Sequence, residues 1–347
     1  MIIKIANRFR PFSHVANSIT LIPNSELAAE IYPSYIHIFN VATKDTLYEK
    51  HFSFGPLEKF TVILNLEKGR IEVTGRAASG FIRYFVDPTS IYFLKGGEEE
   101  KKVIFQEDKK IEPLLQRCRL SLGCHKAQNA EAIFARQDLT EILPIWFFLS
   151  QSLPKVADVK KPHFSPTLLT QVEEALKAND KGEGVYTALA AFFKAAFKGL
   201  FFPRLTDDYH QGFLLPIIQA SHPFPLLILQ KSYPLICQLF FQEREREREK
   251  MWRFLPCLPP QFHAGKLCDL VTSKGHKISL EWTKKTIFRL EIQAISDDHY
   301  AFKFHPDIKR FRLLNQGTSK TLGSVCSNGQ EIMLRKNESY LLDRFER

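Results

Sequence analysis

Alternating apolar and polar positions dominate the first third of the chain. Residues 60–66 and 70–74 alternate on either side of a short segment ending at Gly69, which predicts a β-hairpin. Further short runs of β-branched and aromatic residues lie before and after it, separated by proline-containing turns. Many short strands with tight turns are typical of an antiparallel sandwich. We therefore predict an N-terminal antiparallel β-sandwich over residues 1–108.

The pattern changes to helical spacing in the middle of the chain. Val185, Leu189 and Phe193 belong to one apolar stripe. Residues 130–143 are rich in helix formers, and Pro144 then starts or kinks a second apolar segment through residue 149. Residues 213–241 are strongly apolar but carry four prolines, which favours short buried helices over a membrane span. The central region, residues 109–254, is predicted to be an α-helical domain.

Glutamate and arginine alternate from residue 243 to 249, and Lys250 follows. On a helix, residues three apart in this run have opposite charges, whereas residues four apart have like charges. These contributions are each a few tenths of a kcal/mol and largely cancel. We interpret the run as a solvated helix tail or a loop.

The last part of the chain returns to a period of two. Residues 277–282 and 288–294 alternate, and Asn328-Gly329 predicts a tight turn. We predict a small C-terminal antiparallel β domain over residues 255–347. The expected fold class is therefore a multidomain α and β protein, with a β-sandwich, a helical domain and a second β domain in that order.

Composition narrows the class of protein without indicating a reaction. The chain has 347 residues, 44% of them hydrophobic and 25% charged, an ordinary globular balance that excludes a disordered chain. No CxxC pair occurs among its six cysteines, and the histidines lack metal-ligand spacing. We expect no metal and no cofactor. The first residues lack the long apolar core of a signal peptide, so we expect a cytoplasmic protein without a membrane segment.

The formal net charge is +10, from 48 basic and 38 acidic residues. A basic C-terminal region could attract nucleic acid or another anionic partner. The residues that motivate this hypothesis are Lys266, Lys274, Lys277, Lys284, Lys285, Arg289, Lys303, Lys309, Arg310 and Arg312. No nucleic-acid motif accompanies them, and alternating strands would scatter them over both faces of a sheet. A solvated surface is the favoured interpretation.

Acidic residues in a polar, aromatic segment are the strongest lead for chemistry. Glycoside hydrolysis needs one carboxylic acid and a second group that activates water. Asp208 follows Asp207 between two apolar regions, where a site residue could lie. Candidate sugar-binding neighbours are Arg204, Tyr209, His210 and Gln211. The alternative is a helix cap or a turn, where aspartate is also common.

A second acidic pair lies one helical turn apart. Asp138 and Glu141 could supply the general acid, with Asp208 as the base or its orienting group. A solvated helix face is the alternative interpretation. Trp146, Tyr209 and Trp252 are candidate stacking platforms for a sugar ring.

The segment from 254 to 282 carries a family resemblance. It contains Leu255-Pro256, Leu258-Pro259, Gly265, Gly275 and a strand ending in Trp282. This arrangement resembles the junction of the helical barrel and the C-terminal β domain in family 95 glycoside hydrolases, the α-L-fucosidase/galactosidase group. The match covers about 30 residues well and some 90 loosely.

The resemblance implies a β-sandwich, a helical toroid and a C-terminal β domain, with inverting hydrolysis of a glycosidic bond. The family's catalytic Asp would correspond to Asp208. We expect a carbohydrate to bind in a cleft between the helical and N-terminal β domains. Because 12 barrel helices of roughly 11–12 residues need more than the central region offers, the expected toroid is partial. The alternative is a non-catalytic scaffold that binds a partner. The oligomeric state is left open.

Overall fold

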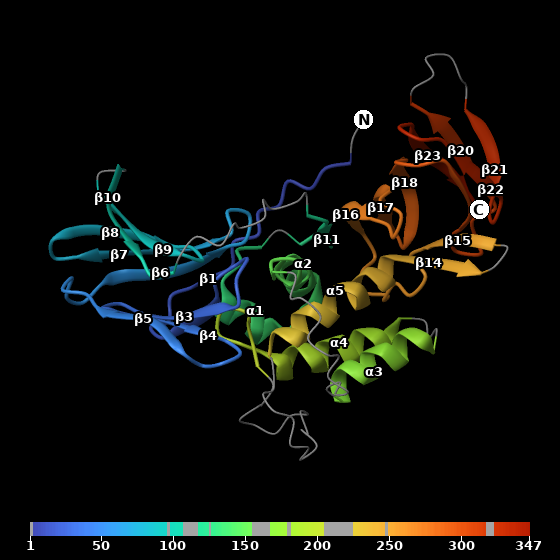
Figure 1. Ribbon diagram of the computed structural model, residues 1–347. Coiled ribbons are helices and arrows are strands. Elements are labelled where there is room, and N and C mark those ends of the chain that lie inside the picture. Colours follow the sequence, from blue (N-terminus) through green and yellow to red (C-terminus); the bar gives the residue numbers. More distant parts are fainter. Residues whose placement is uncertain are drawn as a thin grey trace.

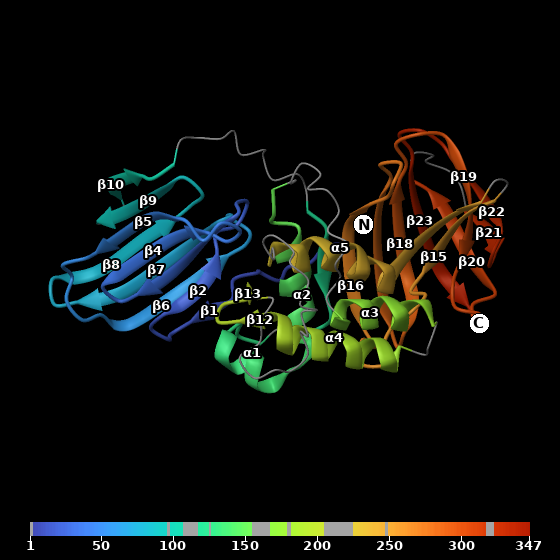
Figure 2. The same cartoon turned by 60° about the horizontal axis from the view of Figure 1, so that its bottom comes forward.

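Three structural units follow one another along the molecule (Figure 1). The computed structural model describes residues 3–95, 98–106, 117–124, 126–154, 167–178, 182–204, 225–246, 249–316 and 323–347. An N-terminal β unit and a C-terminal β unit flank a group of helices, an arrangement that is also visible from a second direction (Figure 2). The predicted β–α–β order is therefore confirmed at this level, and the fold is dominated by antiparallel sheets.

The N-terminal β unit contains two antiparallel sheets. The six-stranded sheet has the order β1-β6-β7-β8-β9-β10. Its strands are β1 (Phe12–Ser13), β6 (Glu58–Asn65), β7 (Arg70–Ala77), β8 (Gly80–Val86), β9 (Ser90–Lys95) and β10 (Glu98–Ile104). The four-stranded sheet consists of β2 (Ser18–Leu21), β3 (Leu27–Tyr32), β4 (Tyr35–Asn40) and β5 (Thr46–His51).

The hairpin predicted around Gly69 is present. β6 and β7 pair antiparallel, and Asn65 lies opposite Arg70 at the turn. Gly69 has a φ of 65°, a conformation that glycine adopts without steric cost. Phe52, which follows β5, packs its ring against Tyr84 and Phe93 of the larger sheet. These contacts hold the two sheets together.

Five helices lie in the described part of the chain. They are α1 (Ala130–Arg136), α2 (Leu139–Ser150), α3 (Thr167–Lys177), α4 (Glu183–Ala196) and α5 (Leu226–Phe240). The run of helix formers over 130–143 is broken at Gln137, whose φ is 55°, and Pro144 lies inside α2. Ten consecutive residues of α2, 141–150, are buried, because this helix is apolar on all sides. The described helices do not confirm the partial toroid expected from the family resemblance.

The C-terminal β unit also has two sheets. The seven-stranded sheet consists, in spatial order, of β11 (Arg119–Ser121), β16 (Gly265–Val271), β17 (Lys277–Thr283), β18 (Thr286–Gln293), β23 (Ser339–Glu346), β20 (Arg310–Asn315) and β21 (Ser324–Ser327). The four-stranded sheet consists of β14 (Phe241–Arg246), β15 (Glu249–Phe254), β19 (Asp298–Lys303) and β22 (Glu331–Leu334). A two-stranded ribbon, β12 (Phe197–Lys198) and β13 (Phe202–Pro203), lies beside the helices.

Two strands that lie outside residues 255–347 in the sequence pair with the C-terminal β unit. β14 and β15 precede residue 255, yet β15 pairs with β19 of the C-terminal unit. β11 follows the N-terminal unit in sequence and pairs with β16. The interpretation of residues 243–250 as a helix tail or loop is therefore wrong: α5 ends at Phe240 and the chain continues directly as the β14–β15 hairpin.

Packing explains two residues of the segment 254–282, Gly265 and Trp282. Gly265 lies opposite Trp282 across β16 and β17. A Cβ at Gly265 would come within 2.4 Å of the Trp282 ring, so only glycine fits there. The indole nitrogen of Trp282 donates a hydrogen bond to the carbonyl of Phe262. These contacts explain the glycine and the tryptophan by packing alone.

The units are joined by a shared core and by the first described residues. One cluster of buried hydrophobic side chains extends from Phe9 to Leu342 and includes residues of all three units. Near the start of the chain, the Ile3 amide donates to the Glu291 carboxylate of β18, and Asn7 donates to Ser121 of β11. We call residues 3–7 the N-terminal strap, because they run along the C-terminal β unit before the chain enters the N-terminal one (Figure 1).

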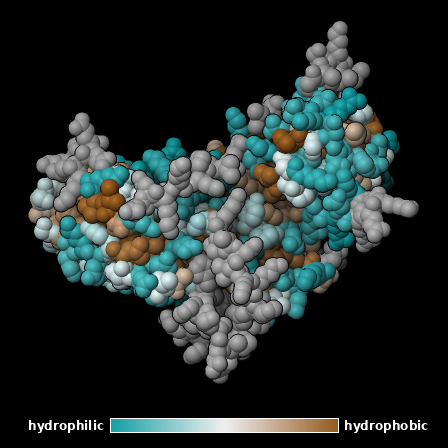
Figure 3. All heavy atoms as spheres, in the orientation of Figure 1, coloured by the Kyte–Doolittle hydropathy of each residue, from teal (hydrophilic) through white to brown (hydrophobic). Residues whose placement is uncertain are grey.

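The surface differs between the two β units. On the face shown in Figure 3, hydrophobic residues form separate patches on the N-terminal β unit, whereas hydrophilic residues cover most of the C-terminal one. None of the helices in the described ranges has the length and apolar character needed to cross a membrane.

Candidate functional site

The polar, aromatic segment proposed from the sequence lies outside the described residues. It contains Asp208, Tyr209, His210 and Gln211. Arg204, just before it, is described: its guanidinium donates to the backbone carbonyls of Ala195 and Lys194 at the end of α4. Arg204 therefore closes a helix end.

Asp138 and Glu141 both have structural partners. Asp138 is the N-cap of α2, where its carboxylate accepts hydrogen bonds from the amide and hydroxyl of Thr140, at 2.9 and 2.7 Å. The Glu141 side chain is 4% exposed and forms ion pairs with Lys126, at 2.7 Å, and with Arg136. Burial raises the pKa of Glu141, but hydrogen bonds and charges from Arg136 and Lys126 outweigh it and lower the pKa overall. A general acid needs the opposite shift.

The two candidate tryptophans are core residues. Trp146 is 1% exposed and packs against Phe192 and Phe197, with ring centroids 5.4 and 5.2 Å away. Trp252 is also 1% exposed and stacks on Tyr300 at 4.1 Å. A stacking platform needs an open ring face. Neither ring offers one, so the structure does not supply the sugar platform expected from the sequence.

A groove lies at the junction of the helices and the C-terminal β unit. Its volume is about 1010 Å³, and α3, α5, β14, β15, β16 and β19 contribute to its walls. That volume lies at the upper end of the roughly 300–1,000 Å³ found for small-molecule sites. Figure 1 shows α5 running directly into β14, with α3 beside α5. We call this feature the junction groove.

The junction groove combines cations with apolar side chains. Its cationic residues are Lys177, Arg244, Arg253 and Lys303, and its carboxylate is Glu243. Its apolar lining includes Leu176, Tyr233, Pro234, Phe241, Met251 and Val271. None of the four cations forms an ion pair with a carboxylate in the described ranges. The groove therefore presents uncompensated positive charge beside apolar surface.

Strand pairing brings three of these cations onto one face of the four-stranded sheet. Gln242 of β14 lies opposite Arg253 of β15, and Arg253 lies beside Lys303 of β19. Arg244 follows two residues after Gln242, so it lies on the same face of the sheet. The outer face of β14, β15 and β19 therefore carries Arg244, Arg253 and Lys303 together.

The inner face of the same strands carries a compact charged cluster. The buried carboxylate of Asp298 accepts hydrogen bonds from Lys250 at 2.5 Å, Lys274 at 3.0 Å and the Tyr300 hydroxyl at 3.0 Å. The His299 amide adds a fourth, at 2.9 Å. Burial raises the pKa of Asp298, but the lysine hydrogen bonds outweigh it and hold the pKa well below its usual range.

A histidine completes the inner cluster. The Ile295 amide donates to Nδ1 of His276, which identifies Nε2 as the protonated nitrogen of the neutral ring. Nε2 lies 3.4 Å from the Tyr300 hydroxyl, which in turn donates to Asp298. Burial lowers the pKa of His276, and burial together with Asp298 raises that of Tyr300. Near neutral pH the His276 ring is therefore neutral and the Tyr300 hydroxyl keeps its proton.

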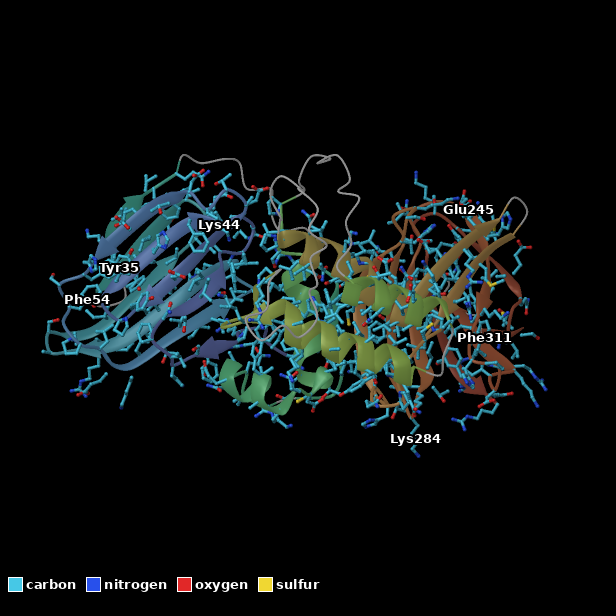
Figure 4. All side chains as sticks on the ribbon, turned by 90° about the horizontal axis from the view of Figure 1, so that it is seen from below. Tyr35, Lys44, Phe54, Glu245, Lys284 and Phe311 are labelled. Atoms are coloured by element: carbon cyan, nitrogen blue, oxygen red, sulfur yellow. The ribbon has the colours of Figure 1, made fainter. Side chains whose placement is uncertain are left out.

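The inner cluster is closed to ligands. His276 is 0% exposed, Tyr300 is 4% exposed, and neither contributes to the junction groove. Lys274, in the turn between β16 and β17, also contacts Glu245 of β14 at 3.5 Å. Figure 4 places Glu245 on the opposite side of the C-terminal β unit from Lys284. The cluster ties the β16–β17 turn to the strands whose outer face lines the groove.

Metal binding has no support within the ranges that the structure describes. No group of three or more His, Cys, Asp or Glu side chains there is placed to hold an ion. All six cysteines are free, and burial raises the pKa of Cys118 and of Cys237. Buried thiols with raised pKa values are poor nucleophiles near neutral pH.

Sequence reasoning missed the junction groove, although one signal for it was present. The alternation of glutamate and arginine from residue 243 onward has the period of a strand. On β14 it directs Glu243 and Glu245 to Ser273 and Lys274, while Arg244 lines the groove. Arg253 and Lys303 carry no such signal, because they reach the groove only through strand pairing.

Comparison with known proteins assigns no family to the chain. No protein-family model matches the chain, and no curated protein matches it. The resemblance of residues 254–282 to family 95 glycoside hydrolases therefore stays a prediction.

Proposed function

We propose that this protein is a non-catalytic binding protein that holds an anionic partner in the junction groove. The observation that carries the proposal is the set of four cations that line the groove without a carboxylate partner in the described part of the chain. Elsewhere, buried carboxylates such as Asp298 and Glu141 are matched by cations. Cations left without counter-charges in a concave site favour an anionic ligand.

The carboxylates placed by the structure support binding over hydrolysis. Asp138 caps a helix, and Glu141 is held ionised by Arg136 and Lys126. Inverting hydrolysis needs two carboxyl groups about 6.5–9.5 Å apart across a substrate site. Neither Asp138 nor Glu141 contributes to the junction groove. Hydrolysis through Asp208 stays the alternative, and it depends on the toroid-like arrangement that the described helices do not confirm.

A binding measurement with a matched pair of variants tests the proposal. The probe is a fluorescein-labelled decaglutamate peptide, followed by anisotropy at low ionic strength and at about 0.15 M salt. We expect Lys303→Glu, on β19, to weaken binding by about tenfold. The control is Lys50→Glu, an exposed lysine on β5 of the N-terminal unit, which we expect to bind like the unmodified protein.

Two results would contradict the proposal. Equal loss in Lys303→Glu and Lys50→Glu would assign binding to overall charge and not to the groove. If the protein hydrolyses a glycoside and Asp208→Asn abolishes that hydrolysis, catalysis would be assigned to the segment around Asp208. A screen of chromogenic glycosides with the unmodified protein and with Asp208→Asn measures the hydrolysis.

A further inference from the structure

The spread of cations over the junction groove favours a ligand with more than one negative charge. Arg244, Arg253 and Lys303 lie on three neighbouring strands. Strands in a sheet are about 4.8 Å apart, so the backbones that carry Arg244 and Lys303 are separated by roughly 10 Å. Together with Lys177, these side chains offer more positive charge than a single phosphate or carboxylate neutralises. A ligand that carries several negative charges along its length is therefore the better complement.

The same ligand must also contact apolar surface. Pro234 of α5 and Val271 of β16 are exposed at the groove, and Val271 is 51% exposed. Met251 lies between Arg244 of β14 and Ala301 of β19 on the cationic face. Apolar surface interleaved with the cations favours a ligand that alternates anionic and apolar groups.

The aromatic residues of the groove do not suit a nucleic acid. Single strands bind by stacking their bases on open aromatic faces. Phe241 is 6% exposed, and one face of the half-buried Tyr233 ring is already stacked on Phe147 at 5.2 Å. A base has little aromatic surface to occupy here, whereas the side chains of a peptide need none.

We propose that the occupant of the junction groove is an extended peptide segment of a partner protein, in which acidic and apolar residues alternate. This inference rests on the proposed binding function and specifies its partner. The acidic side chains pair with Arg244, Arg253 and Lys303, and the apolar side chains pack on Val271, Met251 and Pro234. Affinity therefore needs both the cationic and the apolar residues of the groove.

The experiment compares three labelled probes on the full chain by anisotropy. They are a ten-residue peptide that alternates Glu and Leu, a peptide with the same number of Glu in which Ser replaces Leu, and a dT₁₀ oligonucleotide. We expect the Glu/Leu peptide to bind at least fivefold more tightly than either other probe. Arg253→Glu should weaken its binding at least tenfold, whereas Lys50→Glu should not change it.

A second variant separates apolar recognition from charge. Val271→Ser changes an exposed side chain, so we expect the fold to tolerate it. It should weaken the Glu/Leu peptide about threefold and leave the Glu/Ser peptide unchanged. Circular dichroism of each variant checks that it is folded.

The outcomes distinguish this inference from the proposed function. Equal binding of the two peptides, with both lost in Arg253→Glu, would overturn the apolar–acidic peptide and leave an anion-binding groove. Tighter binding of dT₁₀ that depends on Arg253 would overturn the peptide in favour of a nucleic acid. If no probe binds at concentrations up to 1 mM, at low salt, both proposals fail.

Discussion

The two faces of the strands β14, β15 and β19 use charge in opposite ways. On the inner face, Asp298 is matched by Lys250 and Lys274 and is bonded to Tyr300. On the outer face, Arg253 and its neighbours have no carboxylate partner within the described ranges. Within the described ranges, the same strands thus carry paired charges on the inner face and cations without a carboxylate partner on the outer face.

This difference separates a structural role from a binding role. A buried charge without partners is costly, so folded proteins keep such charges paired and hydrogen-bonded. A cation at a groove wall stays partly hydrated and costs little while the groove is empty. Variants of the inner face should therefore change stability, whereas variants of the outer face should change binding.

The largest effect is expected for Trp252→Ala on the inner face. Trp252 is 1% exposed and stacks on Tyr300, so its truncation should lower the free energy of unfolding by about 3–5 kcal/mol. Urea denaturation followed by near-UV circular dichroism measures the loss. The matched control is Met251→Ala, the adjacent half-buried residue on the outer face, with an expected loss of about 1 kcal/mol or less. Equal losses in the two variants would remove the distinction between the faces.

The second-largest effect is expected from acid, which should reduce the stability that Asp298 contributes on the inner face. The pKa of Asp298 is lowered in the folded protein, so the unfolded chain binds more protons once the pH falls towards about 4. The stabilisation from this carboxylate is present above that pH and is lost as the pH falls further. We expect it to amount to about 2–3 kcal/mol.

Asp298→Asn isolates this contribution. Other carboxylates with lowered pKa values, including Glu72 and Glu141, titrate in the same range. The variant should be less stable at pH 7 and should lose less stability between pH 5 and pH 3 than the unmodified protein. Urea midpoints at several pH values measure both slopes, and parallel slopes would exclude Asp298 as a source of the acid sensitivity.

The smallest change in stability is expected on the outer face. Arg253→Gln removes a cation that has no carboxylate partner among the residues described, so the free energy of unfolding should change by no more than about 0.5 kcal/mol. Lys250→Gln, three residues earlier on the inner face, removes a partner of Asp298 and should cost more. A loss in Arg253→Gln as large as that in Lys250→Gln would show that the outer cation is structural.

Local sequence pattern predicted those elements whose determinants lie close together in the chain. The β6–β7 hairpin was predicted because its alternation and Gly69 are adjacent. The β14–β15 hairpin was missed because its charges were judged only at helical spacing, and because α5 continues into β14 without a separating turn. A test of the same run at a period of two would have favoured a strand.

The site could not be predicted because its residues meet only through tertiary pairing. Arg253 and Lys303 lie far apart in the chain and become neighbours only because β15 pairs with β19, and no local pattern relates them. Trp146 and Trp252 were candidates for sugar stacking because their chemistry suits it, but burial is decided by the whole fold. Asp208 and its neighbours lie outside the described residues, so their role stays a prediction.

The N-terminal strap has a consequence for the order in which the molecule is made. The partner of Ile3 is Glu291, and the partner of Asn7 is Ser121. A ribosome that adds about 5–20 residues per second needs roughly 15–60 s to reach position 291. During that interval Ile3 lacks its partner on β18, although β11, which carries the partner of Asn7, has already been made. The Ile3 end of the strap can therefore dock only after β18 has left the ribosome.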